Sequence, residues 1–189
     1  MKELKPAILM CLLMTLLCGG LYPALVTGIS QAVFPRQANG SLVHDRSGRV
    51  VGSALIGQPF TGPGSLWPRP SATAEFPYNP MASGGSNLGP TNPALLAAVQ
   101  ERIGALRATG VRGPIPADLV LASASGLDPH LSPEAAMLQV PRIARARGLS
   151  EETVASLVAR FTQKSQLGFL GAPRVNVLAV NLALERSSR

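Results

Sequence analysis

The sequence predicts an α/β (α+β) protein: one N-terminal transmembrane helix, then a single extracytoplasmic domain with a small sheet, about three helices and a long ordered Pro/Gly-rich loop. Three observations predict it. Residues 7–34 carry no charge, and a bilayer core needs only ~20 apolar residues in a helix. Within residues 35–189, apolar residues alternate in some segments and recur at helical spacing in others. Residues 57–93 have a proline or glycine every few positions, which disfavours regular structure.

The uncharged run divides the chain into a cytoplasmic leader, a membrane segment and a domain. We assign residues 1–6 to the leader, 7–34 to the transmembrane helix with an interfacial segment, and 35–189 to the domain. A cleaved signal peptide is the alternative, but the run exceeds the ~7–15 residues of an h-region and no Ala-x-Ala site follows it. A lipoprotein is disfavoured because Leu17 precedes Cys18.

The orientation of the membrane segment does not follow from charge, because the numbers of cations on its two sides nearly balance. It follows instead from the short leader and from the long domain, since long domains translocate largely regardless of their charge. We therefore expect a single pass through the cell inner membrane with the C-terminal domain outside.

Small residues recur within the membrane segment. Cys11, Thr15 and Gly19 follow a small-xxx-small pattern, which lets a second helix approach closely, so they are candidate contacts with a membrane partner. A chance pattern in a leucine-rich segment is the alternative. Cys18 lies seven residues from Cys11, roughly 10 Å along a helix, which is too far for a disulfide. Pro23 removes a helical hydrogen bond and predicts a bend near residues 19–20.

The domain begins with a predicted hairpin and an irregular segment. Residues 41–44 and 49–56 are predicted to be strands, with Gly48 in the left-handed position of the turn between them. Residues 57–93 resemble a disordered segment in composition but contain large apolar groups, including the only tryptophan, Trp67. We therefore expect an ordered loop laid over the core or against a partner.

Helix signals follow in the second half. Asn92 caps a helix from Pro93 to about residue 110. Further helices are expected over 134–140 and 142–147, divided by Pro141, and over 151–163. Residues 174–184 are apolar on both faces, which predicts a long strand in the centre of the sheet.

Composition excludes some functions. The net charge is +7 but aromatics are only 4% and the arginines are scattered, so we expect no nucleic-acid partner; an anionic membrane surface or an acidic partner fits better. His44 and His130 are the only histidines and both cysteines lie in the membrane segment, so we expect no metal site. Arg142, Arg145 and Arg147 could meet carboxylates or lipid phosphates, although a solvated helix face is the favoured interpretation.

A glycine-rich loop before the first domain helix is a candidate nucleotide contact. Residues 84–89 have the G-x-x-x-x-G frame of a phosphate-binding loop, and residues 83–85 partly match the signature of ABC transport ATPases. Pro90 stands in the lysine position, however, so the loop lacks the cation that meets the phosphates. The weak nucleotide-contact candidates are Ser83, Gly84, Gly85, Ser86, Asn87 and Thr91.

Residues 123–130 bring hydroxyl, carboxylate and imidazole groups together. Ser123 or Ser125 with Asp128 and His130 would make a membrane-anchored extracytoplasmic hydrolase, the alternative function. Catalytic triads assemble from separate elements, and no strand-to-helix nucleophile elbow is visible. The favoured interpretation is that these side chains cap turns and bond to the backbone.

An ordered set of motifs runs through the chain: Ser53-Ala-Leu-Ile-Gly-Gln58, Trp67-Pro-Arg-Pro-Ser-Ala72, Pro77-Tyr-Asn-Pro80, Ala82-Ser-Gly-Gly-Ser-Asn-Leu-Gly-Pro-Thr-Asn-Pro93, Ser125-Gly-Leu-Asp-Pro-His130, Gln139-Val-Pro-Arg142, Ala146-Arg-Gly148, Gln166-Leu-Gly-Phe-Leu-Gly171 and Pro173-Arg-Val-Asn-Val177. Over essentially the whole chain, this set resembles the KdpC family, the small single-span subunit of bacterial Kdp-type potassium-transporting ATPases.

The resemblance implies a non-catalytic accessory subunit of a high-affinity potassium pump. Its partners would be the potassium-conducting and ATP-hydrolysing subunits, whose complex it stabilises. It would hold no cofactor of its own, and ATP would bind through the catalytic subunit, whose ATP affinity the family is described as raising. An external domain cannot touch cytoplasmic ATP, so such an effect would require coupling through the membrane helix or other subunits. On the irregular segment, Trp67, Tyr78 and Asn79 are candidate partner contacts.

Overall fold

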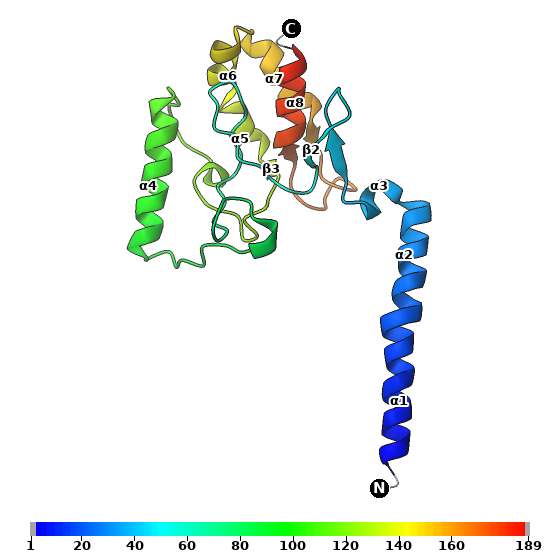
Figure 1. Cartoon of the computed structure of the whole chain (residues 1–189). Helices are drawn as coiled ribbons and strands as arrows, with labels where there is room; N and C mark the ends of the chain where they lie inside the picture. The colour runs from blue at the N-terminus through cyan, green and yellow to red at the C-terminus, as the bar shows by residue number, and fades with distance from the viewer. Residues whose placement is uncertain (1–2, 188–189) are drawn as a thin grey trace. The chain divides into compact units, whose positions relative to one another are not determined.

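A computed structural model describes residues 3–187. Contacts between Cα atoms divide the chain into two compact units, one ending at Leu42 and the other beginning at Val43. Each unit is described by itself. The chain is a mixed α/β protein, with one N-terminal apolar helix and, in the second unit, small antiparallel sheets packed with short helices (Figure 1).

The N-terminal unit is one long helical rod. Helix α1 (Leu4–Leu16) continues through a π-helical turn (Leu17–Leu21) into helix α2 (Tyr22–Val33), and a short helix α3 (Pro35–Ala38) follows. The stretch Leu4–Val33 is long and apolar enough to cross a membrane, and none of its most apolar window is buried within this chain. The π-helical turn contains Gly19 and Gly20 and ends two residues before Pro23; the bend expected near residues 19–20 stays a prediction.

The domain opens with the predicted hairpin. Strands β1 (Leu42–His44) and β2 (Val50–Ser53) form a two-stranded sheet, and Gly48 adopts a φ of +81° in the turn. The Asp45 carboxylate accepts hydrogen bonds from the backbone N–H groups of Ser47 and Arg49 at 2.8 and 3.0 Å. The second strand is shorter than predicted because the chain turns after Ser53.

The second sheet lies beside the C-terminal helices. Strands β3 (His130–Leu131) and β4 (Thr162–Gln163) both pair antiparallel with β5 (Arg174–Asn176), with Leu131 and Thr162 each opposite Val175. The remaining domain helices are α4 (Pro93–Ala108), α5 (Pro133–Met137), α6 (Val140–Arg147), α7 (Glu151–Arg160) and α8 (Val177–Ser187). Helix α7 packs against α5, α6 and α8, so these four helices and β5 form the centre of the domain.

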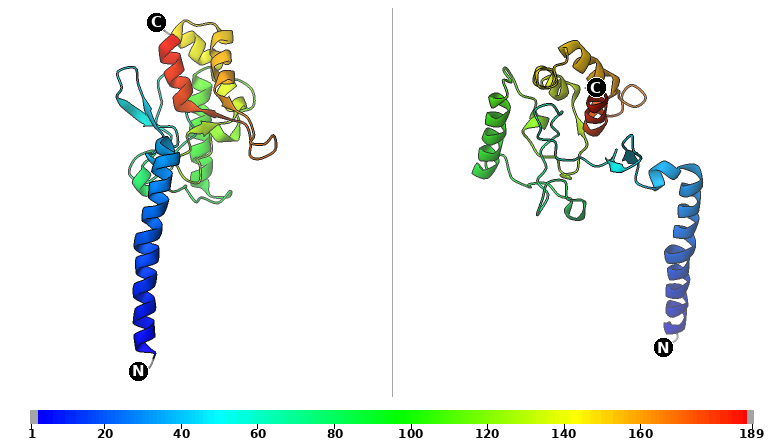
Figure 2. Two further views of the ribbon diagram at one scale, coloured as in Figure 1. Left: turned by 90° about the vertical axis from the view of Figure 1, so that its right-hand side faces the viewer. Right: turned by 45° about the horizontal axis from the view of Figure 1, so that its top comes forward.

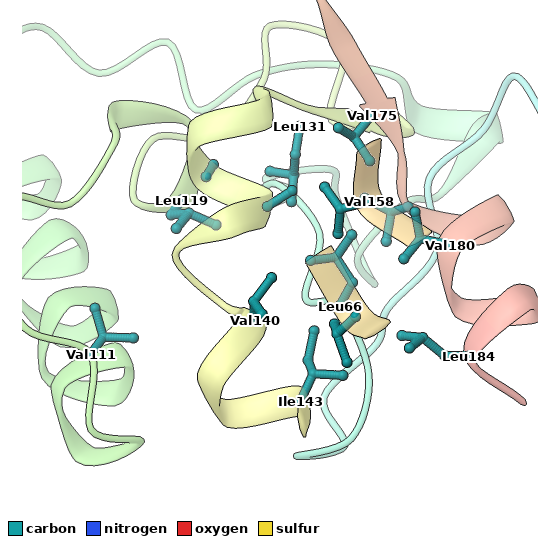
Figure 3. Packing of buried hydrophobic residues seen from close by; sticks show 14 of the residues in the cluster. Leu66, Val111, Leu119, Leu131, Val140, Ile143, Val158, Val175, Val180 and Leu184 are labelled. Atoms are coloured by element: carbon teal, nitrogen blue, oxygen red, sulfur yellow. The ribbon is translucent and has the colours of Figure 1, made fainter. Parts of the chain in front are cut away.

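One hydrophobic core joins these elements. Figure 3 shows side chains from α6, α7, β5 and α8 converging around Leu66, which comes from the irregular segment. Leu66, Ile143, Val175, Val180 and Leu184 are completely buried. The irregular segment therefore supplies part of the core instead of only covering it.

The prediction of a long strand over residues 174–184 is wrong. Only β5 is extended; it is the central strand of its sheet, and α8 follows it directly. The Asn176 side chain accepts a hydrogen bond from the N–H of Ala179 at 3.0 Å, which caps the helix. Val177, Val180, Asn181 and Leu184 are buried at i, i+3, i+4 and i+7. Apolar residues in this segment fit both the two-residue spacing of a strand and the spacing of a helix, so tertiary packing decides between the two structures.

Three other helix predictions differ from the structure. The break predicted at Pro141 falls at residues 138–139 instead, because α5 ends at Met137 and α6 begins at Val140, with Pro141 in its first turn, where a proline needs no N–H partner. Helix α7 ends at Arg160 instead of near residue 163, because Thr162 and Gln163 leave the helix to pair with β5. The predicted inner face of α4 is only partly covered: Leu106 is buried, whereas Leu96 is 53% exposed. Helix α4 stands at one side of the domain, separated from α7 and α8 by irregular chain (Figures 1 and 2).

We predict that Ile143→Ala lowers the free energy of unfolding by about 2–5 kcal/mol, because it leaves a cavity among completely buried side chains. Urea titration of the full chain in detergent measures the change. The control is Met81→Ala, since Met81 is 92% exposed and should shift stability by less than about 0.5 kcal/mol. Equal losses in the two variants would contradict the assigned core.

Candidate functional site: the strap and its anchoring side chains

The predicted irregular loop, residues 57–93, is an ordered strap held on the domain by side-chain amides. Asn181 on α8 accepts from the N–H of Leu66 at 2.7 Å and donates to its carbonyl at 3.0 Å. Gln139, just before α6, accepts from the N–H of Trp67 at 2.8 Å and donates to its carbonyl at 3.1 Å. Each amide thus satisfies both backbone groups of one strap residue, as a neighbouring strand would.

Arg142 completes this anchor from the same side. Its guanidinium donates to the carbonyls of Gly62, Pro63 and Ser65 and to Gln139 Oε1, the last at 2.6 Å. It also lies 4.2 Å from the centre of the Trp67 ring, within the range of a cation–π contact. Burial lowers the pKa of Arg142 to about 10, so the group stays charged at neutral pH.

The favoured interpretation of the arginine cluster as a solvated helix face is therefore wrong for Arg142, which is only 6% exposed. Arg147 also reaches the strap, donating to the carbonyls of Gly64 and Leu184. Arg145 is exposed. The sequence around Arg142 does not reveal this role, because the carbonyls that surround its guanidinium belong to residues 62–65, which are distant in the chain.

The predicted partner-contact residues on the strap lie at different depths. Trp67 is half-buried and its indole N–H donates to the Gly62 carbonyl at 2.9 Å. Tyr78 is 8% exposed, adopts a φ of +60°, and donates its hydroxyl to the Arg69 carbonyl at 2.5 Å. Burial, helped by the charge of Asp128, raises the pKa of Tyr78 well above its usual value. Asn79 is 2% exposed, and its side chain accepts from the N–H of Met81 at 3.0 Å, capping the 3₁₀ turn Pro80–Ala82.

The three small residues of the membrane segment are exposed side by side with apolar residues of the helix. Cys11 and Thr15 lie on α1, whereas Gly19 lies inside the π-helical turn. All three are exposed in the single chain, and a Cβ added at Gly19 would meet nothing within 4 Å. The surface around Gly19 is therefore free for another helix.

The glycine-rich loop is bound to the Ser123–His130 segment. Gly84 donates its N–H to the Ser125 carbonyl at 2.9 Å, and the Ser83 hydroxyl donates to the same carbonyl at 3.1 Å. A Cβ on Gly85 would lie 3.1 Å from the Ala124 carbonyl. Ser86, Asn87 and Thr91 are exposed, with Asn87 at a φ of +52°. The N–H of the first glycine is therefore engaged within the fold and is not available to a phosphate, and nucleotide binding at this loop stays a prediction.

The serine, aspartate and histidine side chains of residues 123–130 bond mainly to the local backbone. The Ser125 hydroxyl accepts from the N–H of Leu127 at 3.1 Å, and Asp128 Oδ1 accepts from the N–H of His130 at 3.0 Å. His130 Nδ1 lies 3.6 Å from Asp128 Oδ1, but within residues 3–187 no hydrogen bond joins the imidazole to Ser123 or Ser125. The three groups are close in sequence without forming a nucleophile–base pair.

Asp128 connects this segment to the strap electrostatically. Its Oδ2 lies 3.3 Å from the Arg69 guanidinium, which also donates to the carbonyls of Leu121 and Ala122. Burial by itself would raise the pKa of Asp128, but the hydrogen bonds from His130 and Arg69 and the charge of Arg69 outweigh it and hold that pKa below 3.8. The Asp128 carboxylate is therefore charged at physiological pH and lies as a fixed anion between the strap and the Ser123–His130 segment.

The strap and α4 enclose an apolar groove of about 400 Å³. Phe60, Trp67, Pro68 and Tyr78 line it from the strap, and Leu106 from α4. Among the described residues, no group of three or more His, Cys, Asp and Glu side chains could hold a metal ion.

The sequence reasoning missed Gln139, Asn181 and Gly126. Gly126 has a φ of +67°, and a Cβ there would lie 2.5 Å from the Thr73 side chain and 2.8 Å from the Gly84 carbonyl. A polar residue such as Asn181 in the middle of an apolar run was the available signal, because a buried amide must find partners.

The fold and the site together define a class of protein. One N-terminal apolar helix, consistent with a single pass through a membrane, precedes a mixed α/β domain. The polar side chains of that domain mainly hold a long strap in place.

Comparison with known proteins gives the family. The family model described as KdpC: K+-transporting ATPase, c chain matches residues 4–186. Proteins named potassium-transporting ATPase KdpC subunit are 68% identical in Geobacter sulfurreducens, covering 98% of both chains, and 61% identical in Geotalea uraniireducens, covering all of both. One from Methylococcus capsulatus is 58% identical over 97% of both. The chain belongs to the KdpC family.

We predict that Gln139→Leu lowers the free energy of unfolding by at least about 2 kcal/mol, because it leaves the buried backbone groups of Trp67 and one Arg142 donor without partners. Denaturant titration of the full chain measures it. The matched control is Gln100→Leu on the exposed side of α4, where little change is expected. A small effect in both variants would show that the amide anchor is dispensable.

We predict that Asp128→Asn lowers the stability of the domain above pH 3.8, and that the difference from the parent chain disappears as the pH falls further. A folded-state pKa below the unfolded value means that the native state favours the charged form, and this advantage is lost on protonation. Unfolding curves of both chains between pH 6 and pH 3 test it. The pH-dependent part should shrink in an Arg69→Gln background; a constant difference across the range would contradict the assignment.

Proposed function

We propose that this protein is a non-catalytic accessory subunit of an ATP-driven potassium uptake pump, and that it stabilises the complex of the potassium-conducting and ATP-hydrolysing subunits. The observation that carries the proposal is the KdpC match over residues 4–186, together with relatives of nearly equal length that are named as KdpC subunits of a potassium-transporting ATPase. Other Kdp subunits are the partners that such a name implies.

Two surfaces support an assembly role. The membrane helix exposes small residues at Cys11, Thr15 and Gly19, where a neighbouring helix can approach closely in lipid. The strap is ordered before any partner binds, because Gln139, Arg142 and Asn181 already hold its backbone. A preordered surface loses little conformational entropy on association, so it suits a subunit that braces others.

We place the domain outside the inner membrane, with the N-terminus in the cytoplasm. In this orientation the domain contributes no group to cytoplasmic ATP hydrolysis, and the protein has no catalytic site of its own. The backbone-bonded arrangement of Ser125 and Asp128 supports this view.

An effect on ATP affinity is the second part of the proposal. Since an external domain cannot contact cytoplasmic nucleotide, the subunit would raise ATP affinity by binding one conformational state of the pump more tightly than the other. The coupling would pass through the membrane helix or neighbouring subunits, without direct contact between this domain and the cytoplasmic nucleotide.

We predict that Gly19→Leu weakens association with the other pump subunits. A Cβ added at Gly19 meets nothing within 4 Å among the described residues, so a loss of association is expected to come from a partner helix. Co-purification of the other subunits with an affinity-tagged chain from solubilised membranes measures it.

The control is Gly28→Leu, where an added Cβ likewise meets nothing within 4 Å among the described residues and which is not part of the small-residue pattern. Unchanged co-purification in Gly19→Leu would refute packing at this face. If the wild-type chain brought down no other subunit, the proposed function itself would fail.

A further inference from the structure

The connection between β4 and β5 is a rigid hairpin that none of the contacts described above uses. Gln166 and Leu170 exchange backbone hydrogen bonds at 2.9 and 2.8 Å. Leu167 and Gly168 adopt φ values of +53° and +84°, which close the tight turn between them. Both views of Figure 2 show this segment, in brown, projecting from the rest of the domain.

The tip of this hairpin carries large apolar side chains in solvent. Leu167 is 83% exposed, Phe169 76% and Leu170 48%. The whole stretch 166–173 is exposed, so none of these groups packs against the domain core. Together the three side chains expose roughly 400 Å² of apolar surface, a patch of the size that marks interaction sites on monomers.

The charged residues next to the hairpin in the sequence are all cationic. No aspartate or glutamate occurs between Glu152 and Glu185, whereas Arg160, Lys164 and Arg174 lie at the base of the hairpin or next to it. Arg174 donates to the Gln163 side chain at 3.1 Å across the two strands. An apolar tip above a cationic base matches the acyl region and the anionic headgroups of a bilayer.

The size of the tip and the length of the tether favour lipid over a protein partner. A stable protein interface buries about 800 Å² on each partner, about twice what the tip offers, whereas insertion into lipid needs no complementary surface. Only residues 34–42 separate the end of α2 from the domain, a length that reaches at most about 32 Å when fully extended. The domain therefore stays within reach of any membrane that the helix spans.

We propose that the hairpin tip, Leu167, Phe169 and Leu170, inserts into the interfacial region of an anionic bilayer and acts as a second, reversible membrane contact for the domain. This proposal rests on the membrane anchoring in the proposed function but does not require the other pump subunits. The tip adds apolar contact with the acyl region, while Lys164 and its neighbours meet headgroup phosphates.

The test uses the full chain with Phe169→Trp, reconstituted in nanodiscs that contain lipids with brominated acyl chains, which quench tryptophan fluorescence on contact. We expect quenching of the new tryptophan in anionic discs, beyond that of the parent chain, whose only tryptophan is Trp67. Phe76→Trp is the matched control, since Phe76 is an exposed phenylalanine (53%) on the strap, and it should add no quenching.

Two further variants separate the apolar and ionic contributions. Leu167→Asn with Leu170→Ser in the Phe169→Trp chain should abolish the quenching, and the asparagine tolerates the positive φ. Lys164→Gln should reduce the inserted-to-free ratio by up to about fivefold in anionic discs and leave it unchanged in zwitterionic ones.

Resistance of the reconstituted chain to alkaline carbonate extraction shows that the helix is embedded. Absence of added quenching in an embedded Phe169→Trp chain would overturn the hairpin proposal and leave the anchored subunit intact. Equal added quenching in the Phe76→Trp and Phe169→Trp chains would also overturn it, because the contact would not belong to the tip. Extraction of the chain by carbonate would instead refute the membrane anchoring on which both proposals rest.

Discussion

The rest of the domain depends on the hydrogen bonds that three buried side chains make to the strap: the amides of Gln139 and Asn181 and the guanidinium of Arg142. They replace the ladder that a neighbouring strand would provide for residues 62–67, a stretch in which Pro63 and the two flanking glycines disfavour regular pairing. With these backbone groups satisfied, Leu66 can enter the core between α6, α7 and α8 at no exposure. Removing one partner would leave polar groups unpaired in a place that water cannot reach, which costs more than the bond itself contributes.

The second half of the strap is held in place by contacts with residues 123–130. From Arg69 onward the chain lies against residues 123–130, and the contact is close enough that Gly57 and Gly126 leave no room for a Cβ. Asp128 is the charged centre of this contact, bonded to Arg69 on the strap and to the backbone of its own turn. The polar side chains of residues 123–130 thus bond to their own backbone and to the strap, and they do not converge on a reacting centre.

The domain holds its irregular segment in place without disulfides, since both cysteines lie in the N-terminal apolar helix. Side-chain amides and arginine are suited to that task, because each can satisfy several backbone groups at once. The apolar groove beside α4 and the hairpin between β4 and β5 are both carried on this rigid frame, and the hairpin keeps its apolar tip away from the core.

The sequence by itself determined the elements whose signals are local. The apolar run over α1 and α2, the Gly48 turn and the Asn92 cap all depend on neighbours within a few positions, and the structure follows them. The motif set also pointed to the KdpC family. Only the tertiary structure decided the state of residues 177–184, where strand and helix periods are both apolar and the core selects the helix. The tertiary structure alone also decided the roles of Arg142, Gln139 and Asn181, because their partners are distant in the sequence. Gln139 binds the backbone of Trp67, 72 residues away, and Asn181 binds that of Leu66, 115 residues away. These groups can pair only when the strap lies across the helices.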